Sequence, residues 1–341
     1  MMRLPLFDLR APRTTEEAAR ILGGEGANAM LLAGGTDILP NMKRRQQVPR
    51  TLISLRNVGS LKRSQFDAAG ARLGACVTLA EIAEDPRFRN GYSALWQAAA
   101  QVATSHIRNM ATLGGNICLD TRCAYYDQNY EWRKSISFCM KKDGEVCWTA
   151  PGSETCMAVS STDTAPALIA LGARVRLRSG AGEREVLLSD LYQNDGIHYM
   201  LRQPGEIVAE ITLPALHGWK SAYWKLRRRG SFDFPVMSVA AAARLSTAGV
   251  VEEARIVLGA VASRPLVAEE AAKSLLGRPL NQETIAAAAA LAARLAKPLD
   301  NTDFDMSWRK KVTAAFVTYA LRDLRGDDMT SESVALARHV L

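Results

Sequence analysis

Five of the six cysteines in this 341-residue chain lie within fewer than forty residues, and the sixth, Cys76, stands alone. The clustered ones are Cys118, Cys123, Cys139, Cys147 and Cys156. In a secreted chain such clustering indicates disulfides, whereas in a cytoplasmic chain clustered thiols more often bind metal. The cysteines therefore predict a metal site if the chain is cytoplasmic.

Composition favours a cytoplasmic, globular protein. Residues 1–15 already include four charged side chains, so they lack the uninterrupted apolar stretch of a secretory signal. The longest apolar run, residues 285–293, is much too short to cross a bilayer. A net charge of +8 that is spread along the chain, without an aromatic stacking array, indicates a solvated surface. We therefore expect a cytoplasmic protein that binds neither nucleic acid nor a membrane.

Four of the cysteines have a spacing that does not name the metal. Cys123, Cys139, Cys147 and Cys156 are separated by fifteen, seven and eight residues, which matches no ferredoxin or zinc-finger signature. Four thiolates satisfy either a tetrahedral zinc ion or a [4Fe–4S] cluster. Regular periodicity is lost over residues 118–155, so we expect a bound metal to hold this segment together. Cys118 and Cys76 are interpreted as small buried hydrophobes.

Two glycine pairs form the second candidate for chemistry. They lie in Ala33-Gly34-Gly35-Thr36-Asp37 and in Thr112-Leu113-Gly114-Gly115-Asn116. Glycine permits positive φ and lets backbone N–H groups approach a ligand closely, which suits a diphosphate. Either loop alone is also typical of a tight turn, and neither matches the dinucleotide fingerprint or the P-loop.

Regular elements precede both glycine loops. Thr14 followed by Glu17 predicts a capping box at the start of a helix over residues 14–22, and apolar runs predict strands at 30–33, 51–55 and 72–78. Residues 94–107 predict one longer helix before the second loop. Beyond residue 214 the pattern is strands followed by helices, which indicates an α+β domain.

The order of these motifs resembles the FAD-binding subunit of the xanthine dehydrogenase and carbon monoxide dehydrogenase family, the molybdenum hydroxylases. The resemblance rests on Phe7 and Pro12, on residues 31–38, 52–55, 73–80 and 107–116, and on residues 163–168, 206–214, 223–239 and 308–310. It covers nearly the whole chain. It implies an α+β protein with a two-lobed α/β FAD-binding domain of the vanillyl-alcohol-oxidase (PCMH) type, followed by an α+β C-terminal domain.

The resemblance also implies domain boundaries and the residues that hold FAD. The FAD-binding domain is expected at residues 1–216, with lobes at about 1–56 and 57–216 and an insertion at 118–156, and the C-terminal domain at 217–341. Both glycine loops are expected to clamp the FAD diphosphate through Leu31, Leu32, Ala33, Gly34, Gly35, Thr36, Asp37, Ile38, Thr112, Leu113, Gly114, Gly115 and Asn116. Asp163, Val208 and Lys225 match positions that line the flavin or its ribityl chain. A cation such as Lys225 beside the flavin would favour its anionic reduced form.

The insertion departs from the common family pattern and resembles the one found in the 4-hydroxybenzoyl-CoA reductase branch, where it holds a [4Fe–4S] cluster. That resemblance implies Cys123, Cys139, Cys147 and Cys156 as the ligands. It also implies a molybdenum-cofactor subunit, a small [2Fe–2S] subunit and ferredoxin as electron donor, with no substrate chemistry on this chain. Two alternatives stay open: the flavin subunit of an oxidative molybdenum hydroxylase that passes electrons to NAD or quinone, and a non-redox binding protein with structural zinc.

Overall fold

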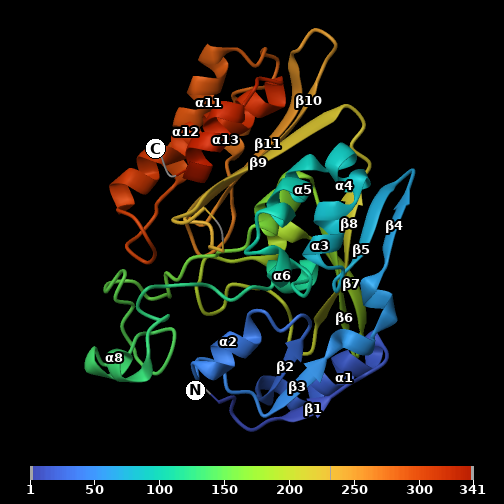
Figure 1. Ribbon diagram of the computed structural model, residues 1–341, viewed down its shortest axis with the longest axis vertical. Helices are drawn as coiled ribbons and strands as arrows, with labels where there is room; N and C mark the ends of the chain where they lie inside the picture. Colours follow the sequence, from blue (N-terminus) through green and yellow to red (C-terminus); the bar gives the residue numbers. More distant parts are fainter. Residues whose placement is uncertain (1–2, 231, 339–341) are drawn as a thin grey trace.

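The computed structural model describes residues 3–230 and 232–338 and consists of three sheets with their covering helices (Figure 1). The first lobe is a parallel sheet in the order β1-β3-β2 with two helices. Its elements are β1 (Asp8–Arg10), α1 (Thr15–Glu25), β2 (Ala29–Leu32), α2 (Ile38–Lys43) and β3 (Thr51–Ser54). Since β2 runs directly into the first glycine loop and α2, that loop lies where a parallel strand ends and a helix begins.

The second lobe is an antiparallel sheet in the order β4-β5-β8-β6-β7. Its strands are β4 (Ser64–Asp67), β5 (Gly70–Gly74), β6 (Arg174–Ser179), β7 (Gly182–Leu187) and β8 (Ile207–Pro214). Its helices are α3 (Leu79–Glu84), α4 (Pro86–Gly91), α5 (Ser93–Ala100), α6 (Ser105–Arg108), α7 (Leu113–Ile117) and α9 (Thr164–Ala170). The second glycine loop starts α7, so it is part of a helix that packs on β8 and α9.

The C-terminal domain is an antiparallel sheet in the order β12-β11-β10-β9. Its elements are β9 (Trp219–Leu226), β10 (Met237–Leu245), β11 (Val251–Gly259), β12 (Leu266–Val267), α10 (Glu269–Lys273), α11 (Gln282–Leu295), α12 (Met306–Arg325) and α13 (Thr330–Arg338). The strands precede the helices, as the sequence predicts. The predicted α+β fold class is confirmed.

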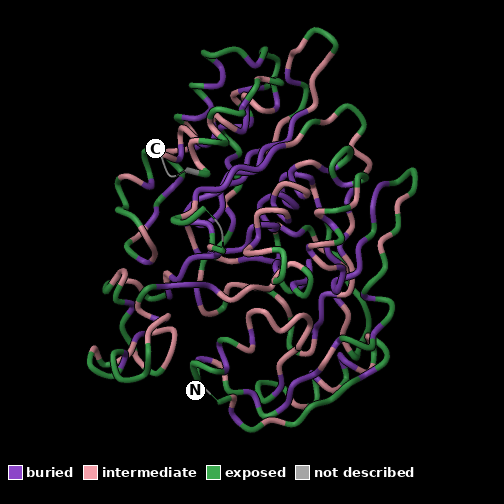
Figure 2. The backbone as a smooth tube through the Cα atoms, in the orientation of Figure 1, coloured by how far each residue is buried: buried purple, intermediate pink, exposed green. Residues whose placement is uncertain are grey.

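Strand β10 shows how the C-terminal sheet joins the rest of the protein. Successive side chains of a strand point to opposite faces. Ala240 and Ala242 lie in the core of the FAD-binding lobes, whereas Ala241 and Ala243 lie in the core formed with α11 and α12. The small alanine side chains allow α9 and α12 to pack on opposite faces of the sheet. In Figure 2 the strands of this sheet run as a buried layer through the molecule.

The cysteine insertion contains one short helix, α8 (Tyr130–Ser135), and otherwise turns. In Figure 1 it projects at one side, between the first lobe (blue) and the C-terminal domain (red). No helix among the described residues combines the length and the apolar character that crossing a membrane requires.

Candidate functional site

The first glycine loop presents a run of unpaired backbone donors. Within the part of the chain that the structure describes, the N–H groups of Gly34, Gly35, Thr36, Asp37 and Ile38 donate no hydrogen bond to another group of the protein. Gly35 has a φ of +74°, and the Asp37 side chain does not cap α2. Consecutive free amides at a helix start form a site for an anion such as a diphosphate. The residues present therefore fit the FAD diphosphate.

The second glycine loop uses its amides differently. Leu113 donates to the Val77 carbonyl at 2.9 Å, and Gly114 donates to the Ala75 carbonyl at 2.8 Å. The amide of Gly115 reaches the Thr112 hydroxyl at 3.1 Å. The first two bonds brace the loop against residues 75–77, and the third lies within the loop. The predicted FAD contacts of the second loop remain a prediction, and these three amides are already occupied.

Gly34 and Gly114 stand where the backbone passes close to other backbone. A Cβ atom on Gly34 would lie 1.8 Å from the carbonyl oxygen of Met110, just before the second loop. A Cβ atom on Gly114 would lie 2.7 Å from the carbonyl oxygen of Ala75. The first contact joins the two glycine loops, so they form one unit. The second is a packing contact inside the second lobe, between the second loop and Ala75.

Asn116 links the second loop to the segment around Asp163. Its buried side-chain oxygen accepts from the hydroxyls of Thr162 at 2.8 Å and Thr164 at 2.7 Å, and from the amide of Thr164 at 3.0 Å. Asn116 thus holds the start of α9, which places Asp163 beside β9. Val208 lies on β8, only 5% exposed, and pairs with Leu177 of β6 in the lobe core.

Asp163 and Lys225 form a buried ion pair with 3.0 Å between Nζ and Oδ1. The Lys225 ammonium also donates to the carbonyls of Gln101 at 3.1 Å and Asp233 at 2.9 Å, so its three donors are used. The Tyr223 hydroxyl donates to Asp163 at 2.7 Å. Burial raises the pKa of Asp163 and lowers the pKa of Lys225, while each partner opposes the shift of the other. Lys225 therefore braces this region through bonds within the protein, and the flavin contacts expected of Asp163, Val208 and Lys225 remain predictions.

The four cysteines expected to bind metal are brought together. Cys123, Cys139, Cys147 and Cys156 are buried, form no disulfide, and line one small cavity. Burial raises the pKa of Cys156 to about 12, and the backbone amide of Ala158 and the ammonium of Lys141 act in the opposite direction. The four thiols thus line a small and largely apolar cavity.

The spread of these thiols bears on the kind of metal. No three His, Cys, Asp or Glu side chains among residues 3–230 and 232–338 converge as a single ion would require. A tetrahedral zinc ion needs all four sulfurs at about 2.3 Å from one point. A [4Fe–4S] cluster binds each thiolate through a different iron, so it takes thiols that surround a larger body. The four thiols that line the cavity supply the number of ligands that a [4Fe–4S] cluster requires, and the same number suits a tetrahedral zinc ion.

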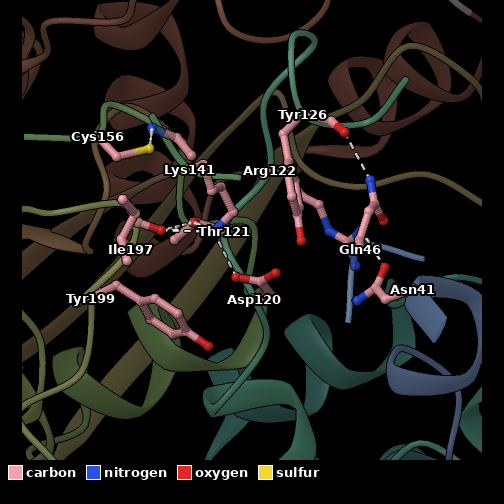
Figure 3. Close-up of polar contacts among 12 residues, drawn as sticks. Asn41, Gln46, Asp120, Thr121, Arg122, Tyr126, Lys141, Cys156, Ile197 and Tyr199 are labelled. Atoms are coloured by element: carbon pink, nitrogen blue, oxygen red, sulfur yellow. Dashed lines mark hydrogen bonds and ion pairs between the residues drawn. The ribbon is translucent and has the colours of Figure 1, made fainter. Parts of the chain in front are cut away.

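Arg122 connects the cysteine insertion to the first glycine loop, a role that no local sequence pattern indicates. Its guanidinium contacts the Asp37 carboxylate and lies 3.2 Å from the Asn41 side-chain oxygen. Gln46 donates to the Tyr126 carbonyl at 2.8 Å in the same region (Figure 3). The insertion is thus fixed to α2 and to the loop with the free amides.

The C-terminal domain holds the insertion near the first and near the last of its cavity-lining cysteines. Asn301, which precedes α12, accepts from the amide of Ala124 at 2.8 Å and donates its side-chain amide to the carbonyl of Met157 at 2.7 Å. The amide of Ser160 donates to the carbonyl of Ala262 at 2.9 Å. The cysteine cavity therefore lies at a junction of both FAD-binding lobes and the C-terminal domain.

Comparison with known proteins agrees with this architecture. The family described as the FAD binding domain in molybdopterin dehydrogenase matches residues 6–216, and the carbon monoxide dehydrogenase flavoprotein C-terminal domain matches residues 221–324. The aldehyde oxidoreductase FAD-binding subunit PaoB of Escherichia coli K12 is 35% identical over 246 residues, 70% of this chain and 76% of that protein.

Relatives and solved structures also cover almost the full length. The carbon monoxide dehydrogenase medium chain of Afipia carboxidovorans is 28% identical over 92% of this chain and 95% of its own. The structure of carbon monoxide dehydrogenase from Hydrogenophaga pseudoflava superimposes with a TM-score of 0.78 at 26% identity, over 95% of this chain and 99% of that one. This chain belongs to the FAD-binding oxidoreductase subunits of the xanthine dehydrogenase and carbon monoxide dehydrogenase family of molybdenum hydroxylases.

Proposed function

We propose that this chain is the flavin and iron–sulfur electron-transfer subunit of a 4-hydroxybenzoyl-CoA reductase. One observation supports the second cofactor above all: four widely spaced cysteines lie around a single buried cavity beside the FAD loop. FAD supplies the exchange of one or two electrons, and the cluster the exchange of one. The chain's own residues bind the diphosphate, hold the cysteines and fix the distance between the two sites.

In the proposed complex, this subunit delivers electrons and a molybdenum-cofactor subunit holds the substrate. Two electrons and two protons convert 4-hydroxybenzoyl-CoA into benzoyl-CoA and water. Reduced ferredoxin supplies the electrons, each ferredoxin losing one, and a small [2Fe–2S] subunit connects this chain to the molybdenum centre. All of these partners belong to the proposal and rest on the resemblance of the insertion.

A second candidate is supported by the relatives. PaoB belongs to an aldehyde oxidoreductase, and another relative is the nicotinate dehydrogenase FAD-subunit of Eubacterium barkeri, 27% identical over 82% of this chain. This chain would then be the FAD subunit of an oxidative molybdenum hydroxylase that passes electrons to NAD or quinone. The cavity lined by four cysteines favours the reductive function, because an enzyme driven by ferredoxin has to accept electrons one at a time.

The test is cofactor analysis of the chain purified anaerobically with its native partners, together with assays of the complex in the reductive and the oxidative direction. We expect FAD together with iron and sulfide, including about four of each for the cluster in this chain. The complex should convert 4-hydroxybenzoyl-CoA into benzoyl-CoA with a reduced one-electron donor. Oxidation of aldehydes or N-heterocycles with no reductive activity would select the second candidate. Zinc without flavin or iron would overturn both.

A further inference from the structure

The cysteine cavity has one charged residue in its lining, Lys141. The other described lining residues are the four cysteines, aromatic and apolar side chains and a threonine. The side chain of Lys141 is only 7% exposed. A buried ammonium group beside the cavity acts on a guest there through a medium of low dielectric constant, where charges interact far more strongly than in water.

The position of the Lys141 ammonium is fixed by three acceptors. Nζ donates to Asp120 Oδ1 at 2.8 Å, to the Thr121 hydroxyl at 2.7 Å and to the carbonyl of Gly196 at 2.8 Å (Figure 3). All three donors of the ammonium are used, so it makes no hydrogen bond to a guest in the cavity. Its influence on such a guest is therefore electrostatic.

The neutralising carboxylate lies on the far side of this ammonium. Asp120 pairs with Lys141 but does not line the cavity, whereas Lys141 does. The cavity thus faces the positive end of the pair. Gly196, which accepts from the Lys141 ammonium, lies next to the cavity residue Cys156. Its amide donates to the Cys156 carbonyl at 2.7 Å, and an added Cβ would lie 2.8 Å from the Cys156 sulfur.

We infer that Lys141 raises the reduction potential of the [4Fe–4S] cluster held by the four cysteines, and so sets the cluster to accept electrons from the external carrier. The inference rests on the proposed function. Reduction transfers one electron from the carrier to the cluster, with no bond formed or broken, and adds one negative charge to a site that four thiolates already make anionic. Local net charge is among the factors that set cluster potentials, and a fixed cation stabilises the more negative state.

The experiment is a redox titration, monitored by electron paramagnetic resonance, of anaerobically purified complexes containing Lys141→Met, Lys141→Arg or Lys142→Met. Lys142 is the matched control, because it is the next residue, has the same charge, and pairs with Asp143 at 3.7 Å outside the cavity. For Lys141→Met, the ratio of reduced to oxidised cluster at a fixed potential should fall at least tenfold, about 59 mV for one electron. Lys141→Arg and Lys142→Met should titrate like the wild type.

A purely structural role predicts a different pattern. Arginine does not reproduce the three bonds of the ammonium, so a clamp role would disturb Lys141→Arg as much as Lys141→Met. Lys141→Met leaves Asp120 without a partner. The double variant Lys141→Met/Asp120→Asn therefore provides a second measurement, in which the reduction potential of the cluster should again be lower than in the wild type. An unchanged potential in both methionine variants, or loss of iron from both while FAD remains, overturns the role of Lys141. An iron-free wild-type complex overturns the proposed function instead.

Discussion

A close backbone contact between Gly34 and Met110 joins the two glycine loops. The missing Cβ of Gly34 lets the first loop touch the chain that leads into the second. The sequence predicts glycine here for the approach of a ligand, and the structure adds a contact between protein segments. Gly114 likewise makes a close contact within the protein, with Ala75.

Gly34→Ala should therefore affect both stability and FAD binding. The new methyl group would overlap the Met110 carbonyl, and forced packing of this kind costs about 1–3 kcal/mol. Chemical denaturation and FAD titration measure the two effects. The control is Gly24→Ala in α1, where an added Cβ meets nothing within 4 Å and alanine favours the helix. Equal stability and FAD affinity of the two variants would contradict the proposed contact.

The cysteines give a second prediction at this scale. Cys139→Ser or Cys147→Ser should remove the cluster, and with it about four irons per FAD in the complex, because the hydroxyl replaces a thiolate ligand. FAD should stay bound, since both residues lie outside the glycine loops. Cys76→Ser, at a buried thiol away from the cavity, is the control. Wild-type iron content in either ligand variant would show that the ligand assignment is wrong.

At the scale of elements, the sequence predicts what periodicity and capping encode. Thr14 caps α1 through the Glu17 amide at 3.1 Å, but the Glu17 carboxylate accepts from the amide of Arg13 and does not close a capping box with Thr14. Residues 94–107 predict a single helix, and the structure divides them into α5 and α6. Ala103 adopts a φ of +44°, and Thr104 then caps α6, so backbone geometry ends a helix that the apolar pattern continues.

Other elements lack a local signal. Helix α2 has six residues and contains Pro40, and α8 lies in the segment without periodicity. The sequence also predicts Lys225 as a cation near the flavin. It does not predict that strand β9 and the start of α9 bury it against Asp163, because such a pairing links positions 62 residues apart.

Asp163→Asn should destabilise the protein strongly at this junction of elements. The change leaves the Lys225 ammonium buried without a counter-charge, which costs about 3–5 kcal/mol. Asp163→Asn/Lys225→Met removes both charges and should recover much of the loss. The shift in denaturation midpoint measures this, with Asp67→Asn at the half-exposed pair with Arg72 as the control, expected within about 1 kcal/mol of wild type. A double variant no more stable than the single one would contradict the model of a mutually compensated pair.

For the whole molecule, the cysteine insertion is the part that depends most on distant contacts. The motifs predict both glycine loops and the four cysteines, and these residues do gather at two neighbouring places. The sequence does not reveal that Arg122, Gln46 and Asn301 tie the insertion to the first lobe and the C-terminal domain. Each of those contacts joins segments at least 80 residues apart, so local sequence patterns cannot predict them.

The link through Arg122 has a consequence for FAD binding and for the position of the cysteine insertion. Its side chain is 10% exposed, and its guanidinium contacts Asp37, at the end of the loop that offers free amides. It also lies 4.8 Å from the centre of the Phe234 ring of the loop between β9 and β10. A single side chain thus couples the first glycine loop, the insertion and the C-terminal domain.

Arg122→Met should weaken FAD binding and loosen the insertion together, because the change frees Asp37 at one end and residue 123 at the other. Removing one partner of a largely buried charged hydrogen bond costs about 1–3 kcal/mol, which corresponds to roughly a fivefold to hundredfold loss where binding depends on it. FAD titration and limited proteolysis within residues 118–156 measure the two effects. The matched control is Arg44→Met. Arg44 and Arg122 each lie 3.5 Å from Asp127, but Arg44 is half-exposed and makes no ion pair with Asp37 among the described residues. If Arg122→Met loosened the insertion and left FAD affinity at the control value, the insertion would be anchored beside the flavin loop without supporting it.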